Sequence, residues 1–320
     1  MEGEPLVRRS AGIVIAGLLP WAWFVLRDRL GVVTDVLAIV LPMLTLVVAL
    51  VAGSLGLLGR RRPAALAFAV STLLVGVVAT VTPWIPHGTG TVDESRAVRI
   101  AAANIGEGEL EGADTFIGVN ADVLVVSELG SPLTHRLSQA YQYVESYWNG
   151  PAIAVFSHWP LTVLESPGPD LPGFMLRVHA PSGDFDLIAV HVPRPWYTTG
   201  GSTYRQKNPG QPYETTVAGH HRLIEQIAER AAKDSGPVVV AGDLNTTDRG
   251  RDYRILTRPL HDAMLDSWGR PSQIGRWAAL LVRIDHVLIK QGWCSDHNHW
   301  YTIPRSDHHG LVTTIGPCAA

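Results

Sequence analysis

Eight polar side chains in the last two thirds of the chain each stand at the end of a short apolar run or inside one. They are Asn104, Glu128, His191, Asp243, Asn245, Asp285, Asp307 and His308. Hard cations such as Mg²⁺ take a few carboxylate oxygens from a protein and keep several waters, and Glu128, Asp243 and Asp307 supply three carboxylates. Because clustered carboxylates repel one another without a cation, these residue types predict a site for Mg²⁺ or Mn²⁺ with imidazoles and amides around it.

Taken singly, each of these residues has an ordinary structural explanation. Asn104 is a common turn residue, His191 fits a hydrogen-bonded histidine of the core, and the GDLN sequence that ends at Asn245 forms a turn on many folds. Asp285 is harder to explain, because a carboxylate inside the apolar sequence RIDHVLI needs a partner once it is buried. The prediction of a site therefore rests on all of these residues together.

Short apolar runs predict the strands that position these side chains. We expect strands at Val98–Asn104, Ala121–Ser127, Ala152–Ser157, Met175–Ala180, Phe185–His191, Pro237–Ala241, Arg283–Ile289 and Leu311–Ile315. The clearest helix is Glu214–Lys233, whose apolar residues lie on one face, and Glu111–Val119 is a second candidate. Many strands and few helices predict two sheets packed face to face, with the helices outside.

Three apolar segments precede this part of the chain, at residues 11–26, 32–58 and 64–85. Because a helix needs roughly 20 apolar residues to cross a bilayer core, the first segment is short and the other two are long enough. A secretory signal peptide is the alternative for the first segment, but no small-residue cleavage site follows it. We therefore expect a transmembrane region at 1–86, in which Asp35 lies near a helix end and reaches the interface.

The arginines of the short loops predict how these segments are oriented. Five arginines precede the first segment or separate the second from the third, and two lie in the other short loop. The positive-inside rule then places the N-terminus in the cytoplasm. Three crossings leave a linker at 87–96 and a domain at 97–317 on the outer side, so we expect a multi-pass protein of the cell membrane with an extracytoplasmic domain.

Composition limits the partners of this domain. The chain has 46% hydrophobic and 17% charged residues, enough to bury a full core, and from residue 96 onward its formal charge is about −4. Polyanions bind mainly through Lys and Arg, so a nucleic-acid partner is not favoured, and no protein partner is indicated. The only cysteines, Cys294 and Cys318, would lie in a compartment that permits a disulfide, and two unpaired thiols are the alternative.

Two further clusters contain metal-ligand residue types. His220 and His221 lie on the amphipathic helix, where a solvated pair is favoured over a metal site, and the sequence DHNH at 296–299 is predicted to be a polar loop. A long Gly- and Pro-rich loop follows His191, and loops of this kind beside a site often contact the substrate, with ordinary surface aromatics as the alternative. Its aromatic and basic residues are Arg194, Trp196, Tyr197, Tyr204, Arg205 and Lys207.

Six short sequences carry a resemblance to a known family. IAAAN, SELG, AVHVP, AGDLN, RIDHV and SDHHG occur in the order and approximate spacing of the endonuclease/exonuclease/phosphatase (DNase I-like) family, over residues 96–316. The resemblance implies an α/β (α+β) fold, a four-layer sandwich of two mostly antiparallel sheets flanked by helices. With the three apolar segments in front, the chain resembles a membrane-anchored bacterial type of this family.

The resemblance also implies a role for each of the eight residues. Metal-site residues would be Asn104, Glu128 and Asp307, with Glu128 the principal ligand. Asp243 would orient or deprotonate the attacking water. Asn245 and His191 would hold phosphate oxygens, and His308 would face the phosphate. Asp285 would hold His308, because a carboxylate behind an imidazole fixes its tautomer and favours its charged form.

The resemblance and the apolar segments together predict a membrane-anchored, divalent-metal-dependent hydrolase of a phosphodiester or phosphomonoester. Tethering raises the local concentration of an enzyme at a bilayer, which favours a lipid or lipid-linked phosphate as substrate. An extracytoplasmic nuclease is the alternative enzyme, and a non-catalytic receptor or scaffold is the alternative of another class. The chain has Ala103 where the family usually has an aromatic residue and Ser127 where glutamine is common, which is expected to reshape the pocket.

Overall fold

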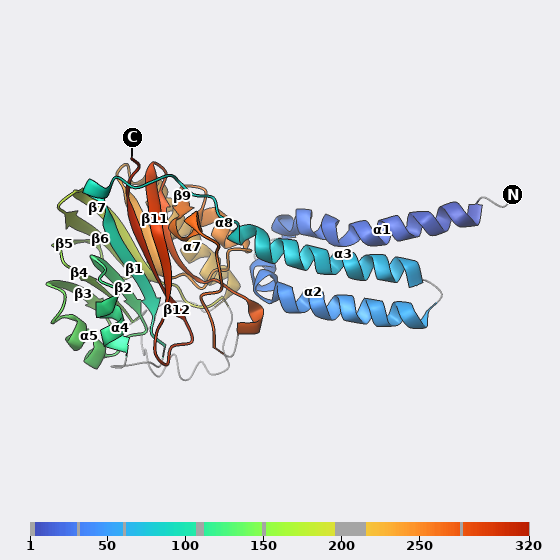
Figure 1. Ribbon diagram of the computed structural model, residues 1–320, viewed down its shortest axis with the longest axis horizontal. Coiled ribbons are helices and arrows are strands. Elements are labelled where there is room, and N and C mark those ends of the chain that lie inside the picture. The colour runs from blue at the N-terminus through green and yellow to red at the C-terminus, as the bar shows by residue number, and fades with distance from the viewer. Residues whose placement is uncertain are drawn as a thin grey trace.

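Three helices that alternate in direction project from one side of a globular part (Figure 1). The computed structural model describes residues 4–30, 33–59, 62–106, 112–148, 152–195, 216–275 and 278–319. The three helices are α1 (Glu4–Leu26), α2 (Val33–Leu58) and α3 (Arg62–Val81). The start of α1 and the start of α3 both lie at the end remote from the globular part, as the arginine pattern requires.

Two of these helices are long and apolar enough to cross a membrane. They comprise Thr34–Leu58 and Arg62–Trp84, while Ser10–Leu26 is a shorter apolar helix. Only 28% and 39% of the most apolar parts of the two long helices are buried inside the structure. All but five of the exposed large apolar side chains in the described part of the chain lie between residues 14 and 85. The described residues therefore leave a large apolar surface of the helices uncovered.

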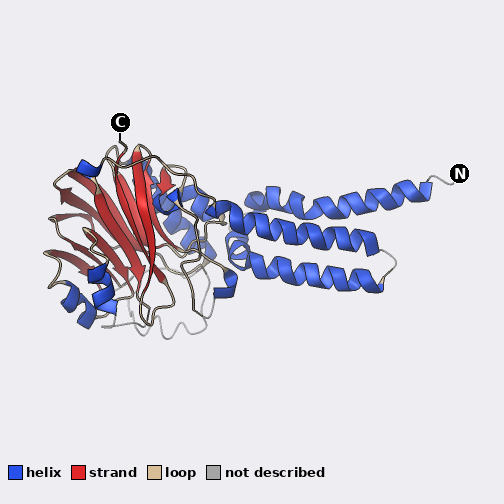
Figure 2. Ribbon diagram, in the orientation of Figure 1, coloured by secondary structure: helices blue, strands red, loops and turns tan. Residues whose placement is uncertain are grey.

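The globular part contains two six-stranded sheets (Figure 2). The first has the order β11-β12-β1-β2-β4-β3, from β1 (Val98–Asn104), β2 (Val123–Ser127), β3 (Tyr143–Tyr147), β4 (Ile153–Ser157), β11 (Trp293–Thr302) and β12 (His309–Pro317). The second has the order β5-β6-β7-β8-β10-β9, from β5 (Leu161–Glu165), β6 (Gly173–Ala180), β7 (Gly183–His191), β8 (Val238–Asp243), β9 (Leu260–Asp262) and β10 (Asp285–Lys290). Each sheet has one parallel pair, β1 with β2 and β7 with β8, and its other pairs are antiparallel, which confirms the mostly antiparallel arrangement.

Helices cover the outer face of each sheet. Helices α4 (Ala113–Gly118) and α5 (Ser131–Leu137) pack on the first sheet, and α7 (Val217–Lys233) and α8 (Arg251–Leu256) pack on the second. A third apolar cluster lies between the two sheets and forms the central core. Short 3-10 helices occupy Arg27–Leu30, Thr82–Trp84, Glu94–Arg96, Ala263–Asp266 and Ala278–Leu280. The predicted sandwich of sheets with helices outside is confirmed.

All eight predicted strands occur, with ends that shift by a few residues. The prediction missed α5 and α8 and four strands, β3, β5, β9 and β11, which are the edge strands of the two sheets. Edge strands carry exposed polar residues that interrupt the apolar runs on which the prediction relied. The two predicted helices are α4 and α7, although residues 111 and 214–215 lie outside the described part of the chain.

Two predictions about polar clusters are wrong. Residues 296–299 belong to β11, where a bulge between Asp296 and His299 interrupts the pairing with β12, and an edge strand accepts polar residues at its exposed positions. His220 and His221 are not a solvated pair, because α7 packs between the second sheet and α2. His220 is buried, and the side chain of His221 is only 12% exposed.

The helical bundle docks on the segment that follows β8. Trp84 donates its indole N–H to Asp248 Oδ2 at 2.6 Å, and the Arg249 side chain donates to the Ala38 carbonyl oxygen in α2 at 3.1 Å. Asp35 lies in the first turn of α2, near the helix end as predicted. Its carboxylate is buried there, because the start of α2 packs against α8 and the carboxylate accepts the backbone N–H of Asp252 at 3.0 Å.

Cys294 at the start of β11 and Cys318 after β12 form a disulfide. This bond decides between the two alternatives that the sequence leaves open. It fastens the C-terminal residues to the sheet at a point where Cys318 also pairs with Val92 of the linker.

Candidate active site

Six strands bring the predicted site residues to one edge of the sandwich. These residues are Asn104 at the end of β1, Glu128 after β2, His191 at the end of β7, Asp243 at the end of β8, Asp285 at the start of β10, and Asp307 and His308 before β12. Strand register fixes the neighbours in the second sheet, because His191 pairs with Asp243 and Asp243 pairs with Asp285. Side chains from distant parts of the sequence therefore meet at this edge.

Asn104 connects the two sheets through its side-chain amide. Its Nδ2 donates to Asp243 Oδ2 at 2.9 Å and to Glu128 Oε1 at 3.2 Å. Its Oδ1 accepts the backbone N–H of Gly106 at 2.9 Å. In this orientation the amide nitrogen positions both carboxylates, and the oxygen that could bind a metal ion faces Gly106. The metal-ligand role of Asn104 stays a prediction.

Glu128 adopts an unusual backbone conformation just beyond β2. Its φ of +58° lies in the left-handed region, which non-glycine residues seldom adopt and which is frequent at functional sites. His191 Nε2 lies 3.5 Å from Glu128 Oε1. Burial alone raises the pKa of Glu128, but the His191 charge and the hydrogen bond from Asn104 bring the pKa below its usual range. The carboxylate is therefore ionised at neutral pH.

His308 and Asp285 form a buried pair. His308 Nδ1 donates to Asp285 Oδ2 at 2.7 Å. Burial acts to lower the pKa of His308, but the charge and the hydrogen bond of Asp285 outweigh it and raise the pKa to about 10. The imidazole is therefore a cation at neutral pH. Its Nε2 lies 3.9 Å from Asp307 Oδ1, on the side away from Asp285.

Gly242 allows β8 to bring Asp243 close to β7. A Cβ at residue 242 would lie 2.0 Å from the Val190 carbonyl oxygen, and the φ of +135° also requires glycine. Asp243 Oδ1 accepts the backbone N–H of Asn245 at 2.9 Å. Burial and the neighbouring Asp285 raise the pKa of Asp243. Its carboxylate is thus held in a fixed direction and is more basic than an exposed aspartate.

Asn245 turns the chain away from β8. Its φ is +46°, and its Nδ2 donates to the Val192 carbonyl oxygen at 2.8 Å. An amide nitrogen carries two hydrogens, so this bond leaves one for a further acceptor.

Arg194 contributes a positive charge that helps to lower the pKa of Glu128. The other residues of the predicted substrate loop, at 196–215, lie outside the described part of the chain.

Three residues that the sequence did not single out support the site. Ser306 Oγ donates to the Asn104 carbonyl oxygen at 2.8 Å and accepts the His308 N–H at 2.9 Å. Ser272 Oγ accepts the Asp285 N–H at 3.1 Å, and Gln273 Nε2 lies 3.4 Å from Asp307 Oδ2. Ser306 belongs to the SDHHG sequence and was identifiable there, whereas the sequence around Ser272 and Gln273 has no recognisable pattern.

The donors at this edge fit a divalent cation. Carboxylate oxygens of Asp243 and Asp285 lie within 4.8 Å of each other and of the His308 ring, and Asp285 Oδ1 is buried without a hydrogen-bond partner. Glu128 and Asp307 are 28% and 45% exposed, so both carboxylates can meet a hydrated ion. A donor set dominated by carboxylates suits Mg²⁺ or Mn²⁺.

Comparisons with known proteins agree with this arrangement. A conserved protein of unknown function from Enterococcus faecalis V583 is 13% identical, with a TM-score of 0.50 over 68% of this chain and 99% of that chain. A humanised D. rerio TDP2 is 14% identical, with a TM-score of 0.50 over 69% of this chain and 99% of that chain. These likenesses show the fold alone. Comparison with curated proteins finds no match.

A third structure, an endonuclease/exonuclease/phosphatase from Beutenbergia cavernae DSM 12333, is 18% identical, with a TM-score of 0.50 over 70% of this chain and 72% of that chain, and it too shows the fold alone. The comparison with family models goes further. Residues 93–308, more than half of the chain, match the family model directly. The chain belongs to the endonuclease/exonuclease/phosphatase family.

Proposed function

We propose that the chain is a divalent-metal-dependent phosphoesterase that a membrane anchor holds outside the cytoplasm. The observation that carries this proposal is that Glu128, Asp243 and His308 meet at one sheet edge, where Asn104 donates to both carboxylates and Asp285 holds the imidazole. A phosphate ester needs positive charge at its oxygens and a base for the attacking water. A receptor or scaffold would not need this arrangement of side chains.

Glu128 and Asp307 are the residues that would hold Mg²⁺ or Mn²⁺. Both carboxylates are partly exposed, and Asn104 holds Glu128 in place from the neighbouring strand. When bound, the ion would offset negative charge on the phosphoryl oxygens. Gly106 keeps the space beside Asp307 open, since a Cβ there would lie 3.2 Å from Asp307 Oδ1.

Asp243 is placed to orient and deprotonate the attacking water. Its two oxygens are held by the Asn245 backbone N–H and the Asn104 amide, and its raised pKa makes it the stronger base. The water oxygen would form the new bond to phosphorus as its proton passes to Asp243. The bond from phosphorus to the ester oxygen would break, and the alkoxide would take up a proton from solvent and leave as the alcohol.

His308 is placed to stabilise the charge that develops on the phosphate. Asp285 holds its Nδ1, so the ring has a fixed direction and presents Nε2–H on the other side. His191 and Asn245 lie at the same edge and supply further donors for the phosphate oxygens.

The uncovered apolar surface of α1–α3 supports the membrane anchor. Leu50, Leu55 and Leu66 are each more than half exposed, which is unfavourable in water and favourable in lipid. The positive-inside rule then places the remote end of the bundle in the cytoplasm and the catalytic part outside. A domain held at the bilayer meets lipid or lipid-linked phosphates at high local concentration, which favours them as substrates over nucleic acid.

The test is a substrate panel with the full chain in nanodiscs and Mg²⁺. Phospholipids, prenyl phosphates, inositol phosphates and DNA are compared by the release of phosphate or headgroup, with His308→Ala as the matched control. We expect turnover of a lipid substrate that the control loses. Turnover of DNA alone would overturn the lipid assignment, and no turnover of any phosphate ester would overturn the proposed function.

The anchor has a separate test. A reporter enzyme that is active only after export is fused after residue 95, within the linker that follows α3. We expect an active reporter, and a fusion that is active only with a cytoplasmic reporter would reverse the proposed orientation.

A further inference from the structure

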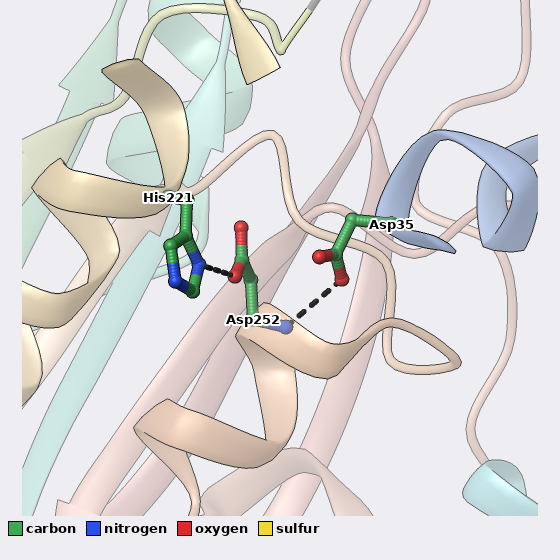
Figure 3. A group of neighbouring side chains, drawn as sticks. All are labelled: Asp35, His221 and Asp252. Carbon is green, nitrogen blue, oxygen red and sulfur yellow. Dashed lines mark hydrogen bonds and ion pairs between the residues drawn. The ribbon is translucent and has the colours of Figure 1, made fainter. Parts of the chain in front are cut away.

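The junction between the helical bundle and the globular part contains a second polar cluster. It comprises Asp35 from α2, His220 and His221 from α7, and Asp252 from α8. In Figure 3, Asp252 lies between His221 and Asp35. The His221 ring faces the Asp252 carboxylate, and the Asp35 carboxylate faces the Asp252 backbone nitrogen. These residues belong neither to the sheet edge that forms the candidate active site nor to any of its six sequence motifs.

The cluster has the spacing of a metal site. One ligand atom from each of Asp35, His221 and Asp252 lies within 4.8 Å of the other two. His220 Nδ1 lies 3.9 Å from Asp252 Oδ2. His221 Nδ1 hydrogen-bonds Asp252 Oδ1, so each imidazole faces one oxygen of Asp252, and His220 lies beside the group of three residues that share the 4.8 Å spacing.

Two buried ligand atoms in this cluster have no hydrogen-bond partner. Asp35 is 6% exposed, and its Oδ2 has none, although Oδ1 accepts the Asp252 N–H. His220 is 1% exposed, and its Nδ1 has none either. A buried polar atom without a partner is unfavourable by about 1–3 kcal/mol, so two such atoms facing one cluster indicate a missing ligand.

The protonation of His220 can be read from its other nitrogen. Its Nε2 lies 3.3 Å from the carbonyl oxygen of Asn245, which can only accept a hydrogen bond, and 3.1 Å from Thr246 Oγ1. The Thr246 hydroxyl donates its own hydrogen to the Leu244 carbonyl oxygen at 3.1 Å, so Nε2 carries the hydrogen. In the neutral ring, Nδ1 then has a lone pair that faces Asp252 Oδ2. Two lone pairs that face one another repel unless a cation lies between them.

The second nitrogen of His221 is also held from outside the cluster. Its Nε2 lies 3.3 Å from Glu225 Oε1, one helical turn further along α7. Metal-binding histidines usually have one ring nitrogen on the ion and the other on a carboxylate or a backbone carbonyl. His221 with Glu225 and His220 with Asn245 both show this arrangement.

We propose that Asp35, His220, His221 and Asp252 bind a structural zinc ion that joins α2 to α7 and α8. Two imidazoles and two carboxylates form a four-ligand nitrogen and oxygen set that Zn²⁺ accepts, whereas Mg²⁺ and Ca²⁺ prefer six or more oxygens and retain water. In this proposal all four ligands come from the protein, and three of them, Asp35, His220 and Asp252, are buried, as in zinc sites that stabilise a fold. The site would fasten the anchor to the catalytic part, independently of the reaction that the active site catalyses.

The zinc content of the full chain tests this proposal. The protein in nanodiscs is stripped with a chelator, equilibrated with Zn²⁺ in excess Mg²⁺ and desalted, and zinc per chain is measured by plasma mass spectrometry. We expect Asp35→Asn and His221→Gln each to hold one equivalent less than the wild type. Asp184→Asn is the matched control, because it alters another Asp–His pair, with His179, that lies exposed on a hairpin.

X-ray absorption of the bound zinc supplies a second readout. We expect nitrogen and oxygen ligands at about 2.0–2.2 Å with the signature of imidazole, and we expect that signature to be lost in His221→Gln. Equal zinc content in the wild type and in His221→Gln would overturn the proposal and indicate a proton shared within the cluster instead. If Asp35→Asn does not fold, His221→Gln decides, because its ring is partly exposed and its loss leaves α2 unchanged.

Discussion

The active-site edge and the junction with the helical bundle use the same side-chain types in different surroundings. At the edge, Glu128 and Asp307 are partly exposed and lie on strand ends. At the junction, Asp35 and Asp252 are buried between three helices. An open carboxylate can exchange water and substrate at a bound ion, whereas an ion whose four ligands all come from the protein serves the fold. Exposure separates the two proposed roles where residue type does not.

The two regions are joined through one residue. Asn245 uses its backbone N–H to hold Asp243 of the active site, and its carbonyl oxygen lies 3.3 Å from His220 Nε2 of the junction cluster. A change at the junction therefore has a short path to the catalytic base. Reagents and substitutions that affect one region more than the other test whether their roles are distinct.

Chelation gives the largest expected effect. We expect EDTA to reduce turnover to background, because Glu128 and Asp307 would lose the ion that offsets charge on the phosphate. Addition of Mg²⁺ or Mn²⁺ without zinc should restore turnover, since the junction site is proposed to be structural. Turnover is measured on whichever substrate the panel identifies. Full activity in a preparation shown to be metal-free would contradict the mechanism.

Substitution at the sheet edge comes next. We expect His308→Ala and Asp243→Asn each to lower turnover by about 10²–10⁴-fold, the usual contribution of a general base or of a charge placed at the phosphate. The thermal melts of both variants are recorded beside the rates. Wild-type turnover in His308→Ala, on a substrate that the parent hydrolyses, would show that the active site lies elsewhere.

Asp285→Asn should have a smaller effect on turnover, because Asp285 acts through His308. The double variant with His308→Ala should be little slower than His308→Ala alone.

The same pair predicts how stability depends on pH. The Asp285 charge raises the pKa of His308 from 6.5 to about 10. The stability that this pair contributes is therefore present below pH 6.5 and is lost as the pH rises through about 10. We expect Asp285→Asn to weaken this dependence in denaturant titrations of the chelated protein, and an unchanged profile would contradict the pairing.

The sequence predicted the active-site edge better than the junction for a physical reason. Asn104, His191 and Asp243 end buried strands, so apolar runs followed by a polar residue mark them locally. Asp35 and Asp252 have no such mark, because their burial depends on how α2 packs against α8, more than 200 residues later in the chain. His220 and His221 were predicted to be solvated, because the spacing of apolar residues along α7 identifies only its apolar face. That spacing does not show that another part of the chain covers the polar face.

The residues that support the active site were only partly predictable from the sequence. Ser306 stands inside a recognisable sequence, but Ser272 reaches Asp285 across a loop that no local pattern predicts. The edge strands β3, β5, β9 and β11 were missed for a similar reason, since only one side of each is paired. Local pattern thus predicts central strands and their ends, and it fails where tertiary packing decides burial.

Glu225→Gln tests the smallest effect and separates a metal site from a hydrogen-bonded cluster. Glu225 lies outside the proposed ligands and contacts the far nitrogen of His221, at 3.3 Å from Nε2. Loss of such a partner usually weakens metal affinity by about 10–100-fold, and we expect the low end because the Glu225 side chain is 53% exposed. Glu229→Gln is the matched control, since Glu229 lies on the same helix and pairs with Lys233 instead. Zinc affinity is measured by competition with a chelator, and equal affinities for the two variants would mean that His221 does not bind the ion through Nδ1.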